Sequence, residues 1–316
     1  MLNVRCTCVI PNQVLLQIIG WKYRQRLWKF ASIGNVYDTH KRSFNSSSVR
    51  IKDVYSLKRS VVPAHKLLEF PLLNTTKSIK RTEGGVICID CKNDVLLRKT
   101  LRQIPSVTRV LNATMSDRSR IALARWRAKL MSQMGEAGFQ EFYRGQINSG
   151  TDFHEKVRMH FRGDFIDLSQ SSNLALRSVS HICNEISEVS VLESHVVHER
   201  LAYRGIIDCV AKYKHKPVII EWKRSDKKKI VLENTFDAPL QLCAYLGAMN
   251  FDNNYPLQVE GGIVVVAYSD GSPADIFTLS MEDCENYWKR WLVRLKQYKE
   301  DAGTSSVLPD IGKVPP

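Results

Sequence analysis

Residues 203–224, YRGIIDCVAKYKHKPVIIEWKR, decide the fold because they predict a hairpin of two strands. A short polar turn at Lys214–Pro217 separates the two apolar runs. The second run, Val218–Ile220, is apolar without alternation, which is typical of a strand buried on both faces. Ionised groups are costly in such a place unless they are paired, hydrated or bound to a metal. Glu221 and Lys223 are therefore expected either to be exposed to solvent at the end of the strand or to belong to a functional site.

The chemistry of this hairpin depends on which side chains share a face. Alternation along a strand puts Glu221 and Lys223 on one face and Trp222 on the other. Asp208 stands where the first strand reaches the neighbourhood of Glu221, and Gly205 relieves crowding nearby. Two partly buried carboxylates repel each other unless a cation lies between them, and Mg²⁺ is bound by a few carboxylate oxygens together with water and substrate phosphate. We expect a metal site here, with Lys223 beside the phosphate or the attacking water. An ordinary cross-strand ion pair is the alternative.

The remaining pattern predicts helices around the hairpin. Leu123, Trp126, Leu130 and Met134 recur on one helical face, behind Ser116 or Asp117 as a cap. A second helix is expected near Gly150 or Thr151. Further elements are expected as helices over 172–186, 236–249 and 281–299, hairpin strands within 195–213 and 216–224, and a buried strand at 261–268. This order indicates an α/β fold with a mixed β-sheet flanked by helices.

Charge divides the chain of 316 residues into a basic N-terminal segment and a globular remainder. The chain carries a net charge of +14, and residues 1–52 hold nine Lys or Arg against the single acid Asp38, with several serines. That composition predicts a mitochondrial transit peptide, and a disordered basic arm is the alternative. The apolar stretch Val14–Trp21 is too short to span a bilayer, so no membrane association is expected. The remaining chain, at +6, still favours a polyanionic partner.

Eight cysteines are scattered along the chain. Only Cys88 and Cys91 have the spacing of metal ligands, and one such pair without a second is weak evidence for zinc. We therefore expect mostly reduced thiols rather than a disulfide framework.

Two further pairs carry polar groups at helical spacing. His154 follows Gly150 by four residues, and Tyr245 follows Gln241 by four, so each pair shares a helix face. An imidazole can join carboxylates around Mg²⁺ or Mn²⁺. Taken together, the order G-x-x-x-H, G-x-x-D, E-x-K and Q-x-x-x-Y resembles the RecB-type branch of the PD-(D/E)xK nucleases, over roughly residues 105–300.

Longer stretches sharpen this resemblance. PSVTRVLNATMS (105–116), GTDFHE (150–155), YRGIIDCVAKY, IIEWKRS and FDAPLQLCAYLGAMN (236–250) are similar to a mitochondrial member of this branch that degrades single-stranded DNA. The resemblance implies a restriction-endonuclease-like core and a metal-dependent single-stranded DNA exonuclease acting on ends or flaps in the mitochondrial matrix, during replication and repair of mitochondrial DNA. It covers a nuclease domain (105–300). The composition of the remaining chain predicts a transit peptide (1–52), an extended or loosely packed region (53–104) and a flexible tail (301–316).

The resemblance also assigns roles to residues. It implies that His154, Asp208 and Glu221 bind Mg²⁺ or Mn²⁺, that Lys223 is the catalytic lysine, and that Gln241 and Tyr245 close the site. Glu221 departs from the aspartate often found there, which puts the metal geometry in doubt. Glu199 and Glu193 are candidates for an outer-shell carboxylate. Candidate contacts to the DNA strand are Arg125, Trp126, Arg127, Arg224, Lys227, Lys228 and Lys229.

Some relatives of this branch carry an iron–sulfur cluster on a close set of cysteines near the C-terminus. After Tyr245 this chain has only Cys284, so we expect no iron–sulfur cluster. A monomer with a functional link to the mitochondrial replication machinery is expected. An RNA-directed or structure-specific endonuclease on the same site, and a DNA-binding protein without catalysis, are the alternatives.

Overall fold

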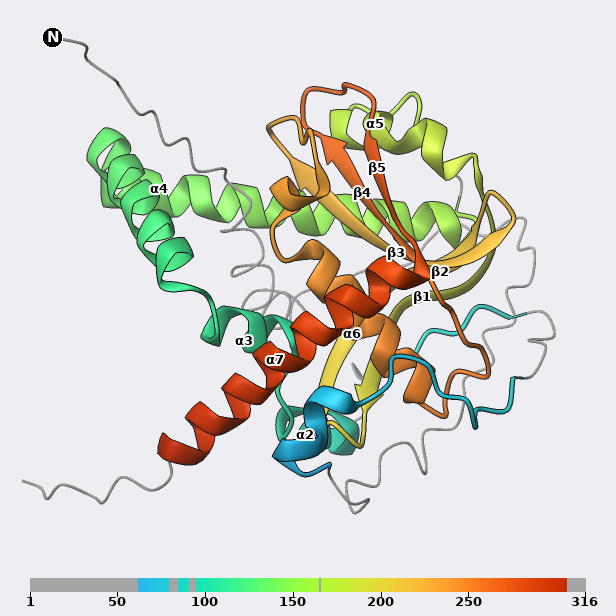
Figure 1. The fold of residues 1–316 in the computed structure, drawn as a ribbon. Coiled ribbons are helices and arrows are strands. Elements are labelled where there is room, and N and C mark those ends of the chain that lie inside the picture. Colours follow the sequence, from blue (N-terminus) through green and yellow to red (C-terminus); the bar gives the residue numbers. More distant parts are fainter. Residues whose placement is uncertain (1–61, 80–84, 91–94, 165, 306–316) are drawn as a thin grey trace, which may run out of the picture.

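The computed structural model describes residues 62–79, 85–90, 95–164 and 166–305. Its centre is a five-stranded mixed sheet in the order β1-β2-β3-β4-β5, which confirms the predicted α/β fold (Figure 1). The strands are β1 (Ile186–His198), β2 (Tyr203–Tyr213), β3 (Lys216–Ser225), β4 (Gly262–Tyr268) and β5 (Asp275–Leu279). The helices are η3 (Ala64–Glu69), α2 (Val95–Arg102), α3 (Val107–Ala113), α4 (Asp117–Phe161), α5 (Leu174–Cys183), η4 (Leu232–Thr235), α6 (Ala238–Phe251) and α7 (Met281–Ser305).

The predicted hairpin is present as β2 and β3, which pair antiparallel across a turn at Lys214 and His215. The segment 195–213, expected to be one strand, is instead the end of β1, a turn at 199–202 and β2. β3 pairs parallel with β4, and β5 adds an antiparallel edge that the sequence did not predict. The strand at 261–268 and the helices α5, α6 and α7 lie close to where their patterns predicted them.

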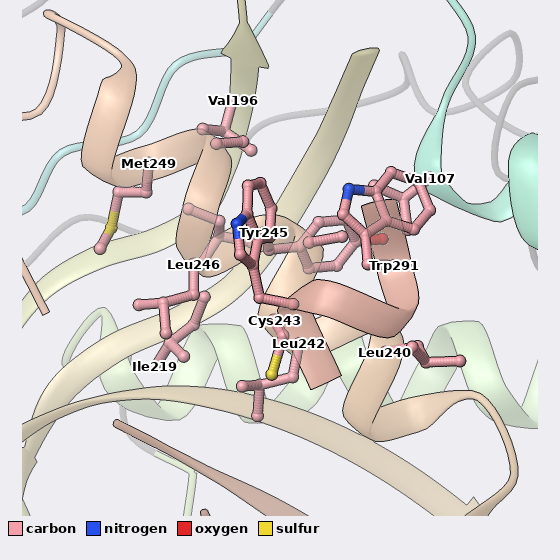
Figure 2. Packing of buried hydrophobic residues seen from close by; sticks show 14 of the residues in the cluster. Val107, Val196, Ile219, Leu240, Leu242, Cys243, Tyr245, Leu246, Met249 and Trp291 are labelled. Atoms are coloured by element: carbon pink, nitrogen blue, oxygen red, sulfur yellow. The ribbon is translucent and has the colours of Figure 1, made fainter. Parts of the chain in front are cut away.

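Alternating side chains of the central strands supply two separate cores. Ile219 packs with α6 and α7 on one face, whereas Ile220 and Trp222 pack with α5 and the end of α4 on the other. Figure 2 shows the first core, where Ile219 and Trp291 surround residues of α6 such as Tyr245. Because Glu221 and Lys223 share the alternation of Ile219, β3 presents them toward α6.

Helix α4 is a helical hairpin rather than a single rod. Ser116 caps its start, as expected, by accepting a hydrogen bond from Ser119 N. At Gly135 the backbone takes φ 71° and ψ 171°, a conformation that favours glycine, and the chain changes direction there (Figure 1). The second half is already helical from residue 136, so a separate helix starting near Gly150 was wrong.

The segment before α3 contributes to the core where the structure describes it. Leu67, Phe70 and Leu72 are buried against α6 and α7, and residues 85–90 run along the outer edge of β1, with Ile87 bridging Val191. Ile89 is also buried, whereas Cys88 is exposed, and the expectation of an extended or loosely packed region over 53–104 stays a prediction. The predicted transit peptide and most of the tail lie outside the described residues. Within the described ranges, no helix combines the length and apolar composition needed to cross a bilayer.

Candidate active site

The site lies where β2 and β3 separate. Their paired register ends at Cys209 opposite Ile220, and one further step would place Asp208 opposite Glu221. Past this pair, Trp222 N donates a hydrogen bond to Asp208 Oδ2 at 3.1 Å. Beyond this point β3 continues beside β4 alone. The buried carboxylates of Asp208 and Glu221 lie in the middle of the two strands, at the point where their pairing ends.

A third carboxylate comes from β1. The β1–β2 register pairs Leu192 with Cys209 and Ser194 with Ile207, so Glu193 lies across from Asp208. Glu193 has φ 42°, an unusual value for a side chain of this kind, in a strand that is irregular elsewhere as well. Local irregularities of this type re-aim side chains near functional sites. Glu193, Asp208 and Glu221 thus follow one another on three adjacent strands.

His154 of α4 completes this group. Its Nδ1 atom lies 3.5 Å from Glu193 Oε1 and 3.6 Å from Asp208 Oδ1. That nitrogen is buried and has no hydrogen-bond partner among the described residues. Ligand atoms of the three side chains lie within 4.8 Å of one another, which is the arrangement of a candidate metal-binding triad. A buried nitrogen without a partner, facing two acids of which Asp208 is almost fully buried, fits a divalent cation.

Glu221 is adjacent to this triad but oriented toward Lys223. Lys223 Nζ donates to Glu221 Oε1 at 2.6 Å. Burial of Glu221 and the nearby Asp208 carboxylate raise its pKa to about 7, although Lys223 acts in the opposite direction. Lys223 alone therefore does not offset burial and the repulsion between the two acids, and a bound cation would supply further positive charge.

A chain of hydrogen bonds holds Lys223 from the side of α6. Lys223 Nζ donates to Gln241 Oε1 at 3.1 Å, and Gln241 Nε2 donates to Tyr245 Oη at 3.0 Å. The Tyr245 ring lies directly over Gly205, where an added Cβ would be 2.2 Å from its Cε1 atom. The glycine and tyrosine singled out from the sequence are therefore in contact, and the glycine provides the space for the ring.

Most of the basic residues at the end of β3 and just after it contact other side chains of the protein. Arg224 donates to Gln146 of α4 at 3.1 Å and pairs with Asp226 at 3.2 Å. Lys228 pairs with Asp275 at 2.9 Å. Lys229 is only 3% exposed and lies over the Phe236 ring, so it is buried in this structure, and its contact with DNA stays a prediction. Lys227 is exposed and remains a candidate.

The three residues of α4 that were predicted to contact DNA bases differ in their exposure to solvent. Arg125 and Arg127 are exposed on its first half. Trp126 instead packs inside the helical hairpin, with its ring 6.3 Å from that of Phe139 and against Ile147. Trp126 is half-buried in this packing, and its role in base stacking stays a prediction.

The two candidate outer-shell acids differ in position. Glu199 lies in the turn between β1 and β2, whereas Glu193 reaches the triad itself. From the sequence, Glu193 was predicted only as a candidate for an outer-shell carboxylate. The signal that could have identified it is its register opposite Asp208, which requires the boundaries of β1.

Comparisons with known proteins identify the family of this chain. Human mitochondrial genome maintenance exonuclease 1 is 44% identical over 237 residues, which cover 73% of this chain and 67% of the human protein. The chain belongs to the mitochondrial genome maintenance exonuclease family. The mouse and Xenopus tropicalis proteins of the same name are each 42% identical over 62% of this chain, and the alignments cover 59% and 58% of those proteins.

Other comparisons add little to this family assignment. No family model matches the chain. The crystal structure of SSO0001 aligns with 59% of the chain and 81% of its own length at 14% identity and a TM-score of 0.31, a likeness too low to support an assignment.

Proposed function

We propose that this protein is a divalent-metal-dependent exonuclease that hydrolyses phosphodiester bonds at the ends or flaps of single-stranded DNA. The observation that carries the proposal is the row of Glu193, Asp208 and Glu221 on adjacent strands, with His154 and Lys223 on either side. Membership of the mitochondrial genome maintenance exonuclease family supports the same reaction. The sequence motifs further favour the RecB-type branch of the PD-(D/E)xK nucleases.

His154, Glu193 and Asp208 would hold the metal ion, with Glu221 beside them. Oxygen ligands joined by one imidazole suit Mg²⁺ or Mn²⁺. Such an ion supplies Lewis acidity toward a phosphate oxygen and lowers the pKa of a bound water. The protein's own task is to hold these side chains in place, which the Trp222 N to Asp208 hydrogen bond does for the central acid.

Lys223 would balance the negative charge that develops on the phosphate. Its amine is held at one side by Glu221 and at the other by Gln241, so it is oriented before substrate binds. A cation fixed in advance stabilises developing charge without reorganisation during the reaction. Gln241 and Tyr245 act on Lys223 through this hydrogen-bond chain and are positioning residues.

Substrate and location complete the proposal. Exposed Arg125 and Arg127 on α4, together with Lys227, supply positive charge for a DNA strand. The basic segment 1–52 would direct the protein to the mitochondrial matrix, and residues 105–300 would form the nuclease domain. A monomer that acts with the mitochondrial replication machinery accords with these assignments.

The decisive experiment is digestion of end-labelled single-stranded and duplex DNA by the full chain with Mg²⁺, Mn²⁺ or EDTA. Lys223→Ala should abolish metal-dependent loss of the single strand because it removes the amine beside Glu221. Lys216→Ala is the matched control, since it removes an exposed lysine from the opposite end of the same strand. Tight DNA binding without cleavage in either metal would refute the exonuclease. Faster cleavage of RNA, or of internal positions in circular single strands, would favour the alternative nucleases.

A further inference from the structure

The glycines of α4 require different explanations. Gly135 needs its positive φ, and an added Cβ at Gly138 would meet Met134 at 3.1 Å. Gly145 and Gly150 have neither reason, because an added Cβ at either position meets no atom within 4 Å among the described residues. Glycine inside a helix costs stability relative to alanine. Neither packing nor backbone geometry therefore explains these two residues.

Their surroundings distinguish them. Gly150 lies midway between Gln146 and His154, at spacings of four residues, so all three share one face of α4. Gln146 is bonded to Arg224 at the end of β3, and His154 faces Glu193 and Asp208. Gly145 is about 140° around the helix from Gly150 and is exposed to solvent. The open space at Gly150 thus lies between the Gln146–Arg224 hydrogen bond on one side and the candidate metal ligands around His154 on the other.

We propose that Gly150 lacks a side chain so that the sugar–phosphate backbone of the bound strand can pass against α4 between Gln146 and His154. This inference rests on the proposed function and names the part of the substrate that the helix contacts. A strand whose scissile phosphate reaches His154 and Asp208 has to cross a neighbouring part of α4. A side chain at position 150 would occupy the space beside that phosphate.

Leucine tests the proposal because it is a good helix former and fills the space. In the full chain, Gly150→Leu should lower kcat/KM for a single-stranded oligonucleotide about 10-fold or more, since small displacements of a substrate are costly to rate. Gly145→Leu is the matched control and should stay within about twofold of the unsubstituted protein, on the same scale. Both variants should raise Tm by about 2 °C because they replace a helical glycine. Calorimetric titration with Mn²⁺ should give the same affinity for all three proteins.

The outcomes separate the proposal from its alternatives. Unchanged cleavage by Gly150→Leu would overturn it, and so would equal losses in the two leucine variants. A weaker affinity for Mn²⁺ in Gly150→Leu would also overturn it, because the new side chain would then act on the metal ligands. If the unsubstituted protein binds an oligonucleotide in EDTA but never cleaves it, the proposed nuclease function fails. The ratio of oligonucleotide affinities of the two variants would then still decide the role of Gly150.

Discussion

Substitution of Gly205 by alanine tests the contact that links β2 to α6. The added Cβ would lie 2.2 Å from Tyr245 Cε1 and 2.4 Å from Cδ1, against about 3.5–4.0 Å for a favourable carbon–carbon contact. The ring therefore has to move by more than about 1 Å, which takes Tyr245 Oη away from Gln241. Overpacking of this kind costs about 1–3 kcal/mol, and loss of the hydrogen bond adds about 1 kcal/mol.

We expect Gly205→Ala to lower the free energy of unfolding by about 3 kcal/mol and Tm by about 6–12 °C. Urea unfolding gives the free energy, and the same substitution made in a Tyr245→Leu background isolates the contact. Leucine has no atoms at the positions of the ring edge, so Gly205→Ala should then cost less than about 1 kcal/mol. Equal costs in both backgrounds would refute the argument that the ring requires this glycine. DNA cleavage should fall in Gly205→Ala without loss of affinity for Mn²⁺, because the substitution acts on Lys223 through Gln241.

Three further predictions concern separate parts of the molecule. Glu193→Gln should weaken Mn²⁺ binding about 10-fold or more in calorimetry, whereas unchanged affinity would remove Glu193 from the triad. Burial lowers the pKa of His198 to about 3, so the unfolded chain binds a proton first as pH falls below about 6.5, and stability declines from there toward pH 3. Acidification from pH 7 to pH 5 should cost about 2 kcal/mol more in the unsubstituted protein than in His198→Phe, measured by urea unfolding, and parallel losses would contradict this. Lys227→Ala should flatten the slope of log affinity against log salt for single-stranded DNA by about 0.7, whereas the buried Lys229→Ala should leave the slope unchanged. The opposite pattern would show that Lys229 reaches the strand.

Local pattern was sufficient for the centre of the site. Alternation along β3 places Glu221 and Lys223 together, and the hairpin register brings Asp208 beside them. Glu193 was harder to find, because its position depends on a backbone irregularity with φ 42° that no spacing rule reveals. The burial of Lys229 against Phe236 was equally hidden, since a run of lysines usually indicates a solvated surface.

The path of the chain was predicted less well than the site. β5 has only five residues, most of them half-buried, so its sequence shows no clear hydrophobic periodicity. Most of β1, residues 187–194, was not predicted as a strand, because its boundary with the preceding helix lacks a strong breaker. The fold-back of α4 at Gly135 depends on contacts between its two halves, such as Trp126 with Phe139, which are 13 residues apart in the sequence.

The hydrogen bond between Arg224 of β3 and Gln146 of α4 limits how far His154 can move relative to the acids of the sheet. Gln146, held by Arg224, and His154 are eight residues apart on one straight part of the helix, which is about 12 Å. A tilt of only about 5° around that anchor would shift His154 by about 1 Å, several times the variation of about 0.2 Å that metal–ligand distances allow. By joining β3 to α4, Arg224 therefore helps to keep an imidazole on the helix aligned with acids on the sheet.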